Sequence, residues 1–329
     1  MRHSIVLSSR IRLARNIRNI PFPSVLTEEG LGRVLEIASD SFERIGEEAD
    51  RLEFVDFCKI GKIEKESLVE NHLVSPDLAK SNKKCGAFIS GNKEICIMVN
   101  EEDHFRIQCI IPGMNLVKAY DICDVYDAAL DRNIDMAFSL KYGYLTSCPS
   151  NVGTGLRASV MLHLPALTMT GHIKNILEFC VKVGIAVRGV YGEHSKSFGN
   201  IYQFSNQKSL GMNEQDIIAG IIHATHQILT HELELRESLE AQNKYGFMDK
   251  ICRSYGILTN AKILSAEESM TLLSDVRLGV DMGYIDLDIE KINNVAAFIQ
   301  PASLQNMRGQ ELNSHERDII RAEIIKKYI

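Results

Sequence analysis

Hydrophobic positions follow two different periods along the chain, and the period changes near its middle. In the first half, short runs alternate apolar and polar residues as strands do. The candidate strands are "GAFISG", "EICIMVN", "HFRIQCII", "LRASVMLHL", "IAVRGVY" and "NIYQFS", and helical spacing occurs at residues 28–45, 116–130 and 173–183. Because these elements show no regular strand-helix-strand rhythm, we expect an α+β fold with an antiparallel sheet and helices packed on one face.

The second half is typical of helices. Six of the seven prolines lie at or before Pro165, and only Pro301 follows. Asn213 is a candidate N-cap, and helical spacing continues through Leu233 and recurs at residues 266–278, 289–298 and 314–328. We therefore predict two domains, with the sheet in residues 1–235 and a helical bundle in residues 236–329.

Composition argues against a nucleic-acid-binding, a disulfide-rich and a membrane-spanning protein. The chain has 329 residues and a net charge of −6, so a protein-wide cationic field for nucleic acid or anionic membrane is absent. The eight cysteines form no CxxC pair, which indicates a reducing, cytoplasmic location. No apolar run approaches the roughly 18 residues that span a bilayer. The arginines before Glu28 resemble those of a transit peptide, but the aliphatic residues around Arg10 and Arg12 alternate as in a strand.

Arginines recur on the polar side of several predicted strands. Residues of one parity share a strand face, which in "NEEDHFRIQC" joins Glu102, His104 and Arg106. For a single strand, a solvated outer face is the simpler interpretation. Five arginines from separate segments instead indicate a polyphosphate site, and no Gly-rich phosphate loop occurs in the sequence. The five are Arg10, Arg12, Arg106, Arg157 and Arg188.

Two carboxylates in the same motifs as these arginines indicate that the site also binds a cation. Glu102 and Glu193 would oppose binding of an anion alone, but they would hold a cationic acceptor of a phosphoryl group and take its proton. Cys148, just before a strand, is either a reactive thiolate in this setting or a buried structural thiol.

Three histidines in the long helical segment are candidate metal ligands. His223 and His226 suit one helix face, but His231 is rotated away and no further ligand completes a set. We therefore predict no metal site formed by protein side chains alone.

Five motifs occur in order over roughly residues 5–235: "SSRIRLARN", "NEEDHFRIQ", "CPSNVGTGLRAS", "RGVYGEHS" and "NIYQFSNQKSLG". Together they resemble the ATP:guanidino phosphotransferases, the phosphagen kinase family. The resemblance implies a curved antiparallel sheet flanked by helices, of the glutamine synthetase-like kind, with ATP and Mg²⁺ bound across it.

The resemblance also implies roles for individual residues. Glu102 and Glu193 match the carboxylates that grip the guanidinium, and Cys148 matches the reactive cysteine beside them. The implied nucleotide contacts are Ser8, Arg10, Arg12, His72, Arg106, Arg157 and Arg188.

Two features resemble the bacterial protein-arginine kinases of the McsB type. The nucleotide motif starts at Ser8, so we expect no small-substrate lid domain before it, and helices follow the catalytic region. The RDxxRA run at residues 317–322 matches a phosphoarginine-sensing pocket in that subfamily, formed here by Arg317, Asp318 and Arg321. Without the resemblance, the same run would indicate an exposed, salt-bridged helix.

The expected function is therefore phosphorylation of arginine side chains in proteins. The resemblance further implies protease-linked quality control under stress, a Clp-type protease and an activator as partners, a heat-shock repressor among the substrates, and a homodimer formed through the C-terminal helices. Two alternatives stay open: a kinase for free arginine or another small guanidine, and a silent phosphoarginine-binding regulator.

Overall fold

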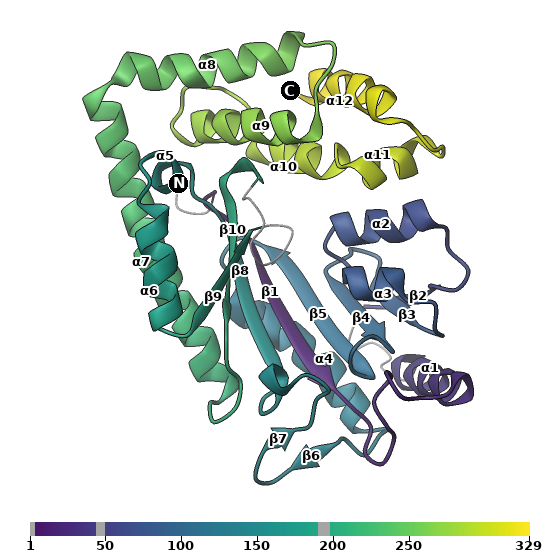
Figure 1. Ribbon diagram of the computed structural model, residues 1–329. Helices are drawn as coiled ribbons and strands as arrows, with labels where there is room; N and C mark the ends of the chain where they lie inside the picture. The colour runs from purple at the N-terminus through teal and green to yellow at the C-terminus, as the bar shows by residue number, and fades with distance from the viewer. Residues whose placement is uncertain (1–3, 44–49, 190–197) are drawn as a thin grey trace.

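The computed structural model describes residues 4–43, 50–189 and 198–329 (Figure 1). Its centre is an eight-stranded sheet in the order β2-β3-β4-β5-β1-β8-β10-β9, and every neighbouring pair is antiparallel. A separate hairpin pairs β6 with β7. The strands are β1 (Val6–Arg15), β2 (Leu52–Asp56), β3 (Gly86–Ser90), β4 (Ile95–Val99), β5 (Phe105–Pro112), β6 (Phe138–Ser139), β7 (Gly143–Tyr144), β8 (Leu156–His163), β9 (Ile185–Gly189) and β10 (Ile201–Asn206).

Helices pack on both faces of the sheet. The helices are α1 (Glu28–Glu43), α2 (Lys62–Glu70), α3 (Pro76–Lys80), α4 (Leu116–Asp131), α5 (Pro165–Met169), α6 (Ile173–Lys182), α7 (Glu214–Gln242), α8 (Lys244–Asn260), α9 (Ala266–Asp281), α10 (Ile289–Phe298), α11 (Pro301–Arg308) and α12 (Ser314–Tyr328).

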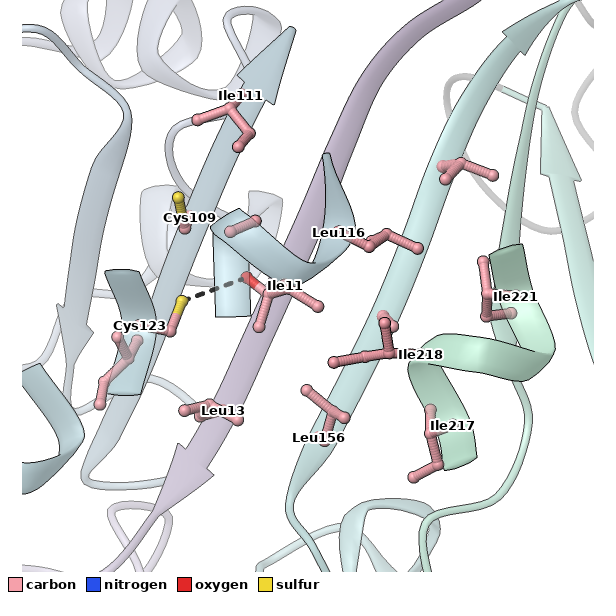
Figure 2. Close-up of a cluster of buried hydrophobic side chains, with 14 of the residues drawn as sticks. Ile11, Leu13, Cys109, Ile111, Leu116, Cys123, Leu156, Ile217, Ile218 and Ile221 are labelled. Carbon is pink, nitrogen blue, oxygen red and sulfur yellow. Dashed lines mark hydrogen bonds between the residues drawn. The ribbon is translucent and has the colours of Figure 1, made fainter. Parts of the chain in front are cut away.

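The main core lies between the sheet and the helices α1, α4 and α7. Alternate residues of β1, such as Ile11 and Leu13, point into it because the strand has a period of two. Figure 2 shows these side chains beside Leu156 of β8 and Ile218 of α7, with the Cys123 thiol 4.0 Å from the Ile11 carbonyl oxygen. The polar residues of β1 are thereby directed to the opposite face.

A smaller core covers part of that opposite face. Phe57, Leu73 and Leu78, from the segment that contains α2 and α3, pack on Ala87 and Met98 of β3 and β4. The same face of β5, β1, β8, β10 and β9 is left for polar side chains.

The C-terminal helices have a hydrophobic core of their own. Leu273 and Val276 of α9 pack against Val295 of α10 and Ile325 of α12. Helix α7 runs across residue 235, and α8 to α12 lie over one end of the sheet (Figure 1). Helix α11 packs on α2, which brings the helical region against the sheet-containing region. No described helix has the length and apolar character that crossing a membrane would need.

The antiparallel sheet and the later helices confirm the predicted fold class, but some local predictions were wrong. The sequence pattern predicts that strand alternation includes residues 100–104. In the structure, β5 begins at Phe105, and residues 100–104 form a turn. His104 is buried in that turn, where its Nδ1 accepts a hydrogen bond from the Ile17 N–H at 3.0 Å. Its imidazole is thus used in packing and not on the arginine face.

Candidate active site

Strand register brings the predicted arginines together on one face of the sheet. Arg12 of β1 lies directly opposite Arg157 of β8, and Arg10 lies opposite Ser159. Residues directly opposite in an antiparallel pair point to the same side. The central strands therefore present three guanidinium groups on the side that α4 and α7 do not cover.

The flanking strands add the other two arginines. Arg106 of β5 pairs with Ala14, two residues from Arg12, and Arg188 of β9 pairs with Gln203. Gln203 is also opposite Met161 of β8, so Arg188 shares the same face. All five predicted phosphate ligands thus lie on one sheet surface.

The cluster is electrostatically unfavourable without an anion. Burial, followed by repulsion from Arg157, Arg106 and Arg188, lowers the pKa of Arg10 to about 10. Burial and the neighbouring arginines also lower the pKa of Arg12 well below its usual value. Arg12 Nε is buried and has no hydrogen-bond partner among the residues that the structure describes. Such a set of cations is suited to a ligand with several negative charges.

A carboxylate that the sequence reasoning missed organises the edge of this cluster. Glu101 binds Arg106 at 2.6 and 2.8 Å, and it also accepts from the Ser75 hydroxyl. The Glu101 side chain is only 3% exposed, whereas the Glu102 side chain is 39% exposed and lies 3.1 Å from Arg106. Glu101 therefore holds Arg106, and Glu102 is the carboxylate open to a second molecule. The sequence signal for this role was the adjacent pair Glu101 and Glu102, which precedes Arg106 by a few residues.

Glu102 and Cys148, which the family resemblance places side by side, lie close together in the structure. The Cys148 thiol hydrogen-bonds the Glu102 carboxyl and lies 3.0 Å from the Ser150 hydroxyl. Burial raises the pKa of Glu102, although Arg106 acts in the opposite direction. Asp103 holds the segment that contains Glu102 against the segment that contains Cys148, because its Oδ1 accepts a hydrogen bond from the Ser147 N–H at 2.7 Å. Asp103 is thus a further residue that the sequence analysis overlooked.

His72 borders the arginine face from the α2 side. It has a left-handed backbone with φ of 59°, and its carbonyl accepts from the Gln108 amide at 2.9 Å. A cavity of about 260 Å³ is lined by His72, Arg10, Arg12 and Arg188 among others. Burial, then repulsion from Arg10, lowers the pKa of His72 to about 4. The imidazole is therefore neutral at physiological pH.

Ser8 lies at the far end of the same surface. A small cavity of about 20 Å³ is lined by Ser8, Arg10, His72 and Met161. The structure thus groups Ser8 with the other predicted nucleotide contacts. Glu193 lies outside the described residues.

Arg15, to which no role was assigned from sequence, is structural. It binds Asp127 at 2.6 Å, and its guanidinium carbon lies 3.5 Å from the centre of the Tyr144 ring. Its Nη1 also donates to the Thr154 carbonyl at 3.0 Å. That close approach is possible because Gly155, with φ of 66°, has no Cβ to meet β1.

The RDxxRA residues lie on α12. Arg321 is 1% exposed and donates to the carbonyls of Ile299 and Leu264 at 2.9 and 2.8 Å. Its Nη1 also binds Asp318 at 2.5 Å, and Arg317 donates to the Leu312 carbonyl. Arg321 therefore ties α12 to α10, while Arg317 and Asp318 are partly exposed.

Comparison with known proteins agrees with this geometry. The sequence model for the ATP:guanido phosphotransferase C-terminal catalytic domain matches residues 33–235. The chain belongs to this family. It is a guanidino phosphotransferase, which confirms the family resemblance of its sequence motifs. A second model, the protein-arginine kinase McsB C-terminal domain, matches residues 244–329.

Individual relatives of this phosphotransferase cover nearly its whole length. A protein-arginine kinase of Caldanaerobacter subterraneus subsp. tengcongensis is 47% identical over 98% of this chain and 96% of that protein. One from Halothermothrix orenii is 45% identical over 98% and 92%. Among solved structures, a taurocyamine kinase of Schistosoma mansoni with bound transition-state analogue components has a TM-score of 0.63 and 29% identity, covering 73% of this chain and 34% of that one. A lombricine kinase has a TM-score of 0.60 and 25% identity, covering 72% and 67%.

Proposed function

We propose that this phosphotransferase transfers the γ-phosphoryl group of ATP to the guanidinium of arginine side chains in proteins. The proposal is carried by Glu102, an open carboxylate beside a face of five arginines. Relatives named protein-arginine kinase, which match 98% of the chain, support a protein as the acceptor.

The arginine face would hold the triphosphate. Arg10, Arg12 and Arg157 stand side by side on β1 and β8, and a polyphosphate would relieve the repulsion that lowers the pKa values of Arg10 and Arg12. The described residues contain no group of three or more His, Cys, Asp or Glu arranged to hold a metal ion. From the family resemblance, Mg²⁺ would arrive with the nucleotide and would supply charge neutralisation at the phosphate oxygens.

Glu102 would hold the acceptor on the open side of Arg106. The acceptor nitrogen attacks the γ-phosphorus, the bond from that phosphorus to the leaving ADP oxygen breaks, and the proton released from the guanidinium passes to the carboxylate. A free guanidinium has a pKa above about 12, so the carboxylate acts mainly by positioning while the proton leaves during attack. Cys148 touches Glu102 and would orient it, and Glu193 is proposed as the second carboxylate from the family motif.

The remaining roles are proposed from the family motifs. Residues 1–235 would form the catalytic domain, and residues 236–329 would serve homodimerisation and phosphoarginine sensing through Arg317, Asp318 and Arg321. We propose a bacterial cytoplasmic enzyme that marks proteins for regulated proteolysis during stress, with a heat-shock repressor among its substrates and a Clp-type protease and an activator as partners.

The test is incubation with MgATP and an unfolded, arginine-rich protein, followed by mass spectrometry under non-acidic conditions. We expect acid-labile phosphoarginine on the protein. The same substrate with every arginine replaced by lysine is the matched control, and Glu102→Gln should reduce the rate by at least a hundredfold.

Two other results would replace the proposal. Turnover of free arginine or taurocyamine with no labelling of protein would identify a small-guanidine kinase, the activity named for the solved taurocyamine kinase. Binding of phosphoarginine without any ATP turnover would identify a silent regulator.

A further inference from the structure

Glu70, the last residue of α2, binds the first turn of α11 across 232 residues of chain. Its Oε1 accepts from the Ala302 N–H at 2.8 Å, and its Oε2 accepts from the Ser303 N–H at 2.6 Å. The Ser303 hydroxyl also donates to Glu70 at 2.9 Å. One carboxylate thus satisfies two backbone donors that the start of a helix leaves free, and it lies at the positive end of the helix dipole.

Neighbouring side chains reinforce this junction. The Asn71 amide donates to the Ser303 hydroxyl at 3.2 Å and to the Ser67 carbonyl at 2.7 Å. Because these contacts come from the last turn of α2, they fix where that helix ends relative to α11.

His72 follows two residues after Glu70. Its N–H donates to the Val69 carbonyl at 2.9 Å, while Gln108, on the arginine face, holds its carbonyl. The His72 backbone is thereby held between the end of α2 and the sheet. Its left-handed conformation leaves little freedom to compensate if the end of α2 moves.

The same junction borders a larger cavity. About 450 Å³ lies between the two domains, with Glu70 and His72 on one side and Arg277, Asn293 and Gln300 of the C-terminal helices on the other. His72 lines this cavity and the arginine-lined cavity as well. A shift of α11 relative to α2 would therefore change the shape of both cavities where His72 lines them.

We propose that Glu70 is a positioning residue for the nucleotide: by holding α2 against α11, it sets His72 at the edge of the arginine face. The helical domain thus contributes to nucleotide affinity through this contact. The inference rests on the proposed function, because it takes MgATP as the ligand of the arginine face.

The test compares Glu70→Gln with Glu66→Gln in the full-length protein. Glu66 is an exposed carboxylate on the same helix that pairs with Lys62, so it is a matched control for charge and helix position. A glutamine at position 70 keeps one acceptor and places an NH₂ group against backbone donors. We expect the Kd for MgATP by calorimetry, and the KM for ATP, to rise five- to tenfold, with kcat at saturating ATP within twofold. Glu66→Gln should change neither constant by more than twofold.

Three further measurements separate this role from a structural one. Glu70→Asp keeps the carboxylate and should recover part of the affinity. Ser303→Ala should raise the Kd for MgATP by a smaller factor, and its combination with Glu70→Gln should cost less than the product of the two factors, because they break one shared contact. A lower melting temperature for Glu70→Gln with an unchanged Kd would overturn the inference, as would additive effects of the two changes.

Wild-type protein distinguishes this inference from the proposed function. If it binds no MgATP, the proposed function fails and this role fails with it. If it binds MgATP and labels protein arginines while Glu70→Gln binds equally well, only this inference fails.

Discussion

Arg10→Gln should make the unliganded protein more stable and weaken its binding of MgATP. The substitution removes one positive charge from the arginine face and keeps a polar side chain. In the fold, burial and three neighbouring arginines disfavour the charged guanidinium, as its lowered pKa records. That cost is present in full below the folded pKa of about 10 and declines as the pH rises from there towards the higher unfolded pKa.

The magnitude follows from the pKa. Relative to an ordinary guanidinium, the lowered pKa of Arg10 corresponds to roughly 3.5 kcal/mol, at about 1.4 kcal/mol per pKa unit. The Arg10 side chain keeps some solvent exposure, and glutamine loses some packing of the aliphatic stem. We therefore expect a net gain of about 1–2 kcal/mol in the free energy of unfolding, equivalent to roughly 2–4 °C in melting temperature.

The assay is thermal unfolding with and without MgATP, with Arg33→Gln as the control. Arg33 is exposed on α1, away from the site, so its replacement should change stability by less than about 0.5 kcal/mol. At a hundred times its Kd, MgATP should stabilise the wild type by about 2.7 kcal/mol. The weaker-binding Arg10→Gln should gain much less, so the order of the two melting temperatures reverses when nucleotide is added.

Two results would refute this reasoning. A lower melting temperature of unliganded Arg10→Gln would mean that packing of Arg10, and not repulsion, dominates its contribution. An equal stabilisation of both proteins by MgATP would mean that the arginine face does not hold the phosphates.

Three further outcomes are expected. Asp127→Asn leaves the Arg15 cation buried and unpaired, so the free energy of unfolding by urea should fall by about 3–5 kcal/mol, with an unchanged KM for ATP; a change below 1 kcal/mol would contradict the pairing. Because the pKa of Glu102 is raised, the acid limb of kcat/KM for phosphorylation should lie above the ordinary glutamate value of about 4.3, as a pH–rate profile would measure. The pKa of His72 is about 4 in the fold and about 6.5 unfolded, so stability should fall as pH drops from 6.5 towards 4, and His72→Gln should flatten that slope in urea titrations at each pH.

The arginine face could be predicted because it depends on strand alternation. Arg10 and Arg12, and Arg157 with Ser159, keep a period of two, and the register then places them opposite each other. The prediction was wrong where the strand ends, at residues 100–104, since a turn has no fixed period and His104 points into packing. Alternation therefore locates a face but not the point at which it stops.

Contacts between distant segments could not be predicted from local pattern. Glu70 and Ser303 are 233 residues apart, and each lies in a short helix, α2 or α11, that the hydrophobic pattern did not reveal. Nothing in a charged nine-residue helix indicates that its last carboxylate meets another helix. Such contacts depend on how the C-terminal helices pack against the sheet-containing region, which periodicity does not encode.

Burial alone does not decide what an arginine does in this protein; its neighbours do. Arg15 has a carboxylate partner, Asp127, and an aromatic ring, so its charge is satisfied and the residue holds the fold together. Arg321 has two backbone carbonyls and Asp318, and it ties α12 to α10. Arg10 and Arg12 have mainly other arginines nearby, and their lowered pKa values record the cost. A charge left uncompensated by the fold is available to a ligand, so the least stable arrangement of arginines identifies the site.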